Sequence, residues 1–115
     1  MPHSHIHHTL AKNNQIFYII LLKVATEILC HKFSFHYRDR EKREIDFIVE
    51  REDQALLGIE IKAGSAIGHN DFRHLKWFRD NIATARPFTG IVLYAGEYMG
   101  FMGKNLQAVP YSTLL

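Results

Sequence analysis

The hydrophobic pattern of the chain begins with a predicted helix over residues 13–31. Ile20, Val24 and Ile28 recur within it at helical spacing, and the apolar residues around them predict that this helix is heavily buried. Residues 1–12 show no such pattern and contain four histidines, so we expect an unstructured tail there, followed by one domain.

Three strands are predicted next, over residues 33–38, 45–50 and 56–62. β-branched and aromatic residues dominate these stretches, and aromatic and polar residues alternate in the first. The connections between them are short and strongly charged, as in hairpin turns. Short connections of this kind predict an antiparallel meander.

The period then changes from two to about 3.6. Phe72, Leu75, Phe78 and Ile82 recur at helical spacing after a start signal at Asn70 or Asp71, and Arg86-Pro87 ends the predicted helix. An apolar strand over residues 90–95 and a short strand over 106–110 follow. The predicted order of elements is α-β-β-β-α-β-β.

Composition restricts the class of protein. Hydrophobic residues make up 47% of the whole chain and charged residues 23%, which is typical of a soluble globular protein. We expect one domain over residues 13–115. The single cysteine, Cys30, cannot form an internal disulfide. The longest apolar run, residues 16–22, is too short to span a membrane, so we expect a cytoplasmic protein with no membrane partner.

Acidic residues interrupt the second predicted strand. Strict alternation would place Glu44 and Asp46 on one face of the strand and the apolar residues Ile45, Phe47 and Val49 on the other.

The third predicted strand repeats this arrangement. Glu60 and Lys62 share one face, and Ile59 and Ile61 occupy the other. If the second and third strands pair across their short turn, Asp46 approaches Glu60 and Lys62. Two adjacent carboxylates resist joint ionisation unless a cation lies between them, and Mg²⁺ prefers such oxygen ligands. The alternative is a solvated strand face without chemistry.

Several ordered motifs resemble those of a known superfamily. Residues 44–47 and 58–63 are similar to the paired motifs of PD-(D/E)xK nucleases. Residues 37–38, 90–97 and 108–110 further resemble one branch, domain-of-unknown-function family 4143, found at the C-terminus of bacterial and archaeal AAA-type ATPases. The resemblance extends from Val24 to the C-terminus. It implies a restriction-endonuclease-like α/β core with a mixed central sheet and flanking helices.

The resemblance also implies roles for individual residues. Asp46 and Glu60 would bind Mg²⁺ or Mn²⁺, Lys62 would be the catalytic lysine, and Glu27 would be the glutamate that the first helix contributes. A partly exposed helix acid is the alternative for Glu27. The family's acidic residue six positions earlier is replaced by Leu21, and the phosphate loop of the ATPase is not in the sequence, so we expect a detached nuclease-like module.

Cationic residues suggest a partner. They surround the first hairpin and line the second helix: Lys32, Arg38, Arg40, Lys42 and Arg43, and Arg73, Lys76 and Arg79. Such groups suit a DNA backbone, although a solvated face with interspersed acids is an equal alternative. His69 and His74 are either general bases or ordinary packing histidines.

Three hypotheses therefore stand at this point. The first is a Mg²⁺-dependent DNA nuclease. The second is a silent module of the same fold that docks on DNA or on an AAA-type ATPase partner, and the third is a structural remnant that is barely folded. The apolar first helix would also suit a homodimer interface.

Overall fold

The computed structural model describes residues 33–50 and 53–114 of the chain. The predicted tail, the predicted first helix and Glu27 lie outside these residues. The described elements, in chain order, are β1 (Phe33–Arg38), β2 (Glu44–Glu50), β3 (Leu56–Ile61), η1 (His69–Phe72), α2 (Arg73–Asn81), β4 (Phe88–Tyr94), β5 (Gly100–Phe101), β6 (Leu106–Pro110) and η2 (Tyr111–Leu114). No helix within them is long and apolar enough to cross a membrane.

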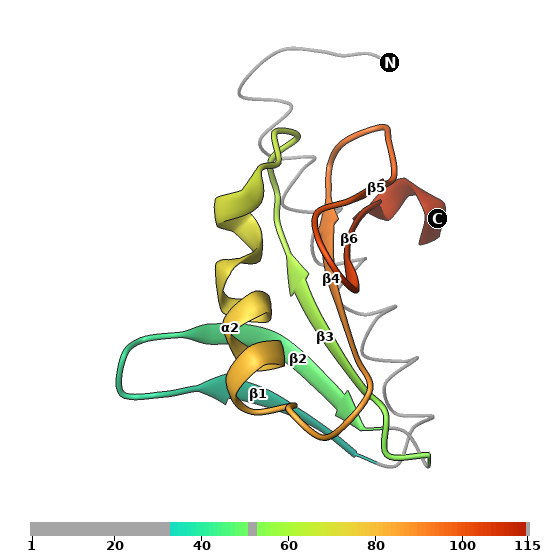
Figure 1. The fold of residues 1–115 in the computed structure, drawn as a ribbon. Helices are drawn as coiled ribbons and strands as arrows, with labels where there is room; N and C mark the ends of the chain where they lie inside the picture. Colours follow the sequence, from blue (N-terminus) through green and yellow to red (C-terminus); the bar gives the residue numbers. More distant parts are fainter. Residues whose placement is uncertain (1–32, 51–52, 115) are drawn as a thin grey trace.

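These elements form a mixed α/β structure around one six-stranded sheet with the strand order β1-β2-β3-β4-β6-β5 (Figure 1). β2 pairs antiparallel with β1 on one side and with β3 on the other, which confirms the predicted meander. β4 then pairs with β3 in parallel, because the intervening helix returns the chain to the same end of the sheet. β6 is parallel to β4, and β5, a two-residue strand that the pattern did not predict, pairs antiparallel with β6.

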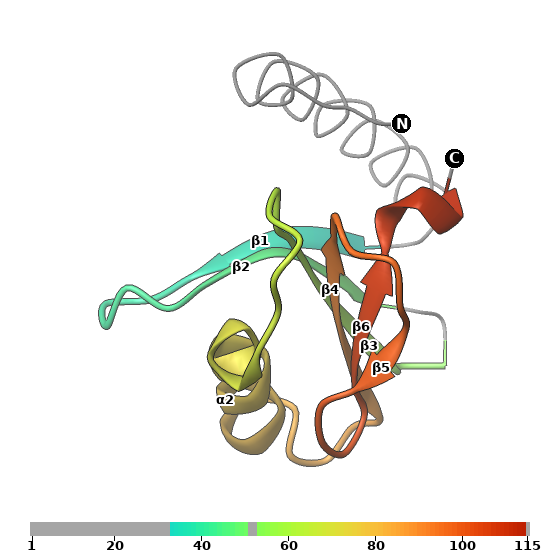
Figure 2. The same ribbon diagram turned by 90° about the horizontal axis from the view of Figure 1, so that it is seen from above.

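Helix α2 covers one face of the sheet (Figure 2). Phe72, Leu75 and Phe78 are buried there against the sheet, as their spacing predicts. Gly58 on β3 permits this close approach, because a Cβ at this position would lie 2.8 Å from the Leu75 Cδ2 atom. Ile82 does not continue the apolar stripe. It follows the last residue of α2 and is half exposed.

The opposite face of the sheet has its own apolar cluster. Val49, Ile59, Leu93 and Val109 are buried together with Tyr111 from η2. The sheet is therefore apolar on both faces over most of β3 and β4, which agrees with the near-continuous apolar sequence of these strands.

A β-bulge interrupts the pairing of β1 with β2. Phe35 lies opposite Ile48 and Tyr37 opposite Ile45, so the one β1 residue between the pairs faces two β2 residues, of which the first is Asp46. Bulges of this kind bend a strand and redirect its side chains, and they are over-represented next to active sites.

Because of the bulge, the side chains of β2 lie on other faces of the sheet than strict alternation predicts. Ile45 and Ile48 both belong to the core under α2, whereas Phe47 and Val49 pack on the opposite face. The prediction that Ile45, Phe47 and Val49 share one face is therefore wrong. Side chains alternate strictly between the two faces only where every residue has one partner on the neighbouring strand. The extra residue on β2 breaks this alternation, so the residues after it lie on the opposite face from the one predicted.

Candidate functional site

The acidic residues of the candidate site lie where the β2–β3 ladder ends. The last regular pair is Phe47 opposite Ile59, and the same register places Asp46 opposite Glu60. Beyond that pair the backbone N–H of Ile61 has a side-chain partner on β2. It donates a hydrogen bond of 2.8 Å to the Oδ2 atom of Asp46. The two strands thus separate at Asp46, and its carboxyl occupies the space between them.

Lys62 follows directly after β3, on the side of the strand that faces η1 and α2. Its Nζ atom donates a hydrogen bond of 2.8 Å to Oδ1 of Asp71, which belongs to η1. Both side chains are about one-third exposed, 35% for Lys62 and 27% for Asp71, so the ion pair contributes little to stability. Its main effect is to hold the ammonium group of Lys62 at Asp71 of η1.

The local electrostatics disfavour two negative charges. Burial, together with the neighbouring charges of Asp46 and Asp71, raises the pKa of Glu60 to about 8. Burial also raises the pKa of Asp46, although the hydrogen bond from the Ile61 N–H opposes that rise. At neutral pH the Glu60 carboxyl is therefore largely protonated unless a cation compensates the charge.

Asp71 is a site residue that sequence reasoning did not assign. The hydrogen bond from Lys62 lowers its pKa, and a second hydrogen bond from the backbone N–H of Gly68 lowers it further, against a partly offsetting desolvation. The sequence identified Asp71 only as a helix start signal. The capping interaction with Gly68 is real, but the contact with Lys62 gives this carboxylate a second role.

Histidines lie at the edge of the site. His36, the β1 residue opposite the bulge, places its Nε2 atom 3.1 Å from a carboxylate oxygen of Glu44, and its Nδ1 atom 3.3 Å from the carbonyl oxygen of Asp46. His74 contacts the backbone of Glu44 through its Nδ1 atom, 3.0 Å from the carbonyl oxygen, which is a packing contact between α2 and β2. His69 lies on η1, at the start of a groove beside α2.

The residues present suit a divalent cation held by few protein ligands. Within residues 33–50 and 53–114, no group of three or more His, Cys, Asp or Glu side chains forms a metal site by itself. Asp46 and Glu60 nevertheless offer two carboxyls whose raised pKa values a cation would reverse. Mg²⁺ commonly takes one or two protein carboxylates and completes its octahedron with waters and substrate phosphates.

Comparison with known proteins gives one match. The sequence profile of the family described as Domain of unknown function (DUF4143) matches residues 22–114, which is most of the chain. Neither the curated proteins nor the solved structures compared with the chain match it.

Proposed function

The chain belongs to the family described as Domain of unknown function (DUF4143), and we propose that it is a Mg²⁺-dependent DNA phosphodiester hydrolase with a PD-(D/E)xK-type core. One observation carries the proposal: Asp46 and Glu60 lie on the neighbouring strands β2 and β3, each one residue beyond the last regular pair, and the charge of Asp46 acts on Glu60. Lys62 lies two residues beyond Glu60, and its ammonium group is fixed by Asp71. Two carboxyls and a lysine at the divergence of two strands provide the charges that phosphodiester hydrolysis needs.

Each residue has a chemical role in this proposal. Asp46 and Glu60 would hold the cation, which when bound lowers the pKa of a water molecule and neutralises charge on the phosphate. Glu60 must release its proton before it can bind a cation, because its pKa is raised to about 8. Lys62 would stabilise the negative charge that develops on the phosphate oxygens, and Asp71 would keep the ammonium group in position.

A second candidate is a silent module of the same fold that binds DNA or protein as the C-terminal accessory domain of an AAA-type ATPase. Two observations favour it. The Lys62 ammonium is already paired with Asp71, and no three His, Cys, Asp or Glu side chains of the described residues are grouped as metal ligands. Such a module would retain the fold and its charged surface without turnover.

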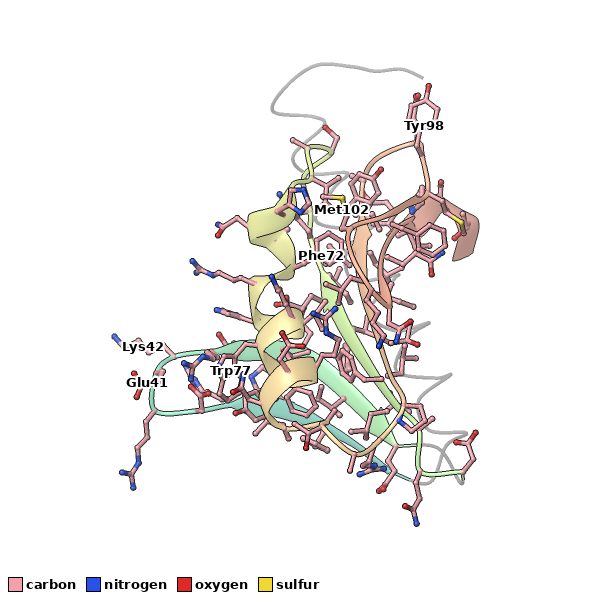
Figure 3. The ribbon with its side chains drawn as sticks, viewed as in Figure 1. Glu41, Lys42, Phe72, Trp77, Tyr98 and Met102 are labelled. Carbon is pink, nitrogen blue, oxygen red and sulfur yellow. The ribbon has the colours of Figure 1, made fainter. Side chains whose placement is uncertain are left out.

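The deciding experiment is the cleavage of supercoiled plasmid in Mg²⁺ or Mn²⁺. We expect nicking by the wild type and none by Lys62→Ala. Lys42→Ala is the matched control, because it removes an exposed lysine from the tip of the β1–β2 hairpin (Figure 3). Equal cleavage by the wild type and Lys62→Ala would remove Lys62 from the mechanism. A folded wild type that binds DNA in EDTA and never cleaves it would support the silent module.

A further inference from the structure

A basic groove runs along one side of α2. It has a volume of about 710 Å³ and lies between η1 and α2 on one side and the turn from β5 to β6 on the other. Figures 1 and 2 show both of these walls on the same side of the sheet. Phe72 and Met102 form its apolar floor, and Figure 3 shows these two side chains close together beside α2.

The charge of the groove has one sign. Arg73, Lys76, Arg79 and Lys104 line it, and no Asp or Glu is among the residues that form its walls. The guanidinium of Arg79 already binds other groups of the protein. It donates hydrogen bonds to Asp80 and to the backbone carbonyl of Lys104, and so holds the β5–β6 turn against α2.

The remaining three cations are exposed. Within the part of the chain that the structure describes, Arg73, Lys76 and Lys104 form no hydrogen bond or ion pair with a carboxylate. A charge pattern of this kind differs from an ordinary solvated face, in which acids and bases alternate and neutralise each other. Three exposed cations thus line one concave surface, and two of them, Arg73 and Lys76, also interact electrostatically with Glu60 and Asp80.

The groove and the candidate site share one element, η1. Asp71, which holds Lys62, and Phe72, which forms part of the groove floor, are consecutive residues of η1. Arg73, the next residue, lines the groove and also interacts electrostatically with Glu60. Arg73 therefore links the charge of the groove to that of the candidate site.

We propose that this groove binds the phosphate backbone of a DNA strand and delivers it to the Asp46–Glu60 site, an inference that rests on the proposed function. Arg73 and Lys76 are three residues apart on α2, a rise of about 4.5 Å, and both line the groove. Lys104 supplies a third contact from the opposite wall. Contacts of this kind position the strand and do not read its sequence.

The test is DNA binding measured by fluorescence anisotropy in EDTA, with the full chain and a short labelled duplex, over a series of salt concentrations. Without metal no cleavage interferes. For Arg73→Gln/Lys76→Gln/Lys104→Gln we expect about tenfold or more weaker binding at moderate salt, and a slope of log K against log salt that is reduced by about 2.7. The double variant Lys76→Gln/Lys104→Gln keeps Arg73, which interacts electrostatically with Glu60. It should reduce the slope by about 1.8.

The matched control removes the same charge elsewhere. Arg38→Gln/Arg40→Gln/Lys42→Gln changes three exposed cations of the β1–β2 hairpin, on the other side of α2 from the groove (Figure 1). Thermal melts establish that all variants are folded. We expect this control to keep most of the affinity. Equal losses in the two triple variants would mean that net charge alone drives binding, and wild-type binding by a folded groove variant would overturn the proposal directly.

Failure of the groove and failure of the hydrolase give different results. If the wild type never cleaves but the groove variant loses binding, the hydrolase is wrong and the groove stands. If the wild type cleaves and the groove variant both binds and cleaves as the wild type does, the groove is wrong and the hydrolase stands.

Discussion

Neutralising position 60 tests the electrostatics of the site without any assumption about activity. Burial and the charges of Asp46 and Asp71 together raise the pKa of Glu60 from 4.5 to about 8. Between these two pH values the folded protein retains a proton that the unfolded chain has lost. The free energy of unfolding therefore falls as pH rises through this window, because the folded state binds more protons than the unfolded state.

The magnitude follows from the shift. Each pH unit contributes about 1.4 kcal/mol, so a window of about 3.5 units corresponds to about 5 kcal/mol between the two ends. Water at the partly exposed carboxyl screens part of this penalty, and we expect about 3 to 5 kcal/mol. A domain of this size has a total free energy of unfolding of about 5–15 kcal/mol, so the effect is large enough to measure.

The assay is urea unfolding in EDTA, followed by circular dichroism, of the wild type, Glu60→Gln and the exposed-acid control Glu41→Gln. At about pH 8 we expect Glu60→Gln to be more stable than the wild type by the full amount, and at about pH 5 we expect nearly equal stability. Glu41→Gln should follow the wild type throughout. A stability difference between Glu60→Gln and the wild type that does not change with pH would refute the reasoning.

Three further predictions follow from the site and its supporting fold. Mg²⁺ at about one hundred times its dissociation constant should stabilise the wild type by about 2.7 kcal/mol in a thermal melt, and Asp46→Asn should abolish this gain. Asp71→Asn should lower the cleavage rate without weakening DNA binding, and it should add no loss in a Lys62→Ala background, because both residues act through one ammonium group. Gly58→Ala should cost about 1–3 kcal/mol in urea unfolding through its contact with α2, whereas Gly100→Ala, with no atom within 4 Å of its new Cβ, should be nearly neutral.

Local periodicity predicted the elements that pack through regular faces. The spacing of Phe72, Leu75 and Phe78 predicted the buried stripe of α2, since each of these side chains meets the sheet one turn after the last. The same spacing failed at Ile82, because α2 ends at Asn81 and the side chain beyond it no longer lies over the sheet. A periodic pattern cannot indicate where tertiary contacts stop.

The geometry of the site depended on contacts that no local pattern contains. Alternation on β2 predicted one shared face for its apolar residues, but the bulge at Asp46 is set by pairing with β1 and by the hydrogen bond to the Ile61 N–H, fifteen residues away. Asp71 carried only a local capping signal, although its contact with Lys62 crosses the turn after β3. Resemblance to a nuclease motif indicated Asp46, Glu60 and Lys62. It gave no information on the groups that bind them, such as the Ile61 N–H at Asp46 and the Asp71 carboxylate at Lys62.

The irregular features of the described fold converge on one point, and this convergence favours function over structure as their cause. A sheet selected only for stability would continue the β2–β3 ladder and fill positions 46 and 60 with neutral side chains. Instead the ladder ends at Asp46, a bulge interrupts the other edge of the same strand, and Glu60 is held where its ionisation is unfavourable. Such costs persist where a charged ligand reverses them. A divalent cation between the carboxyls, as proposed above, would offset the unfavourable ionisation of Glu60.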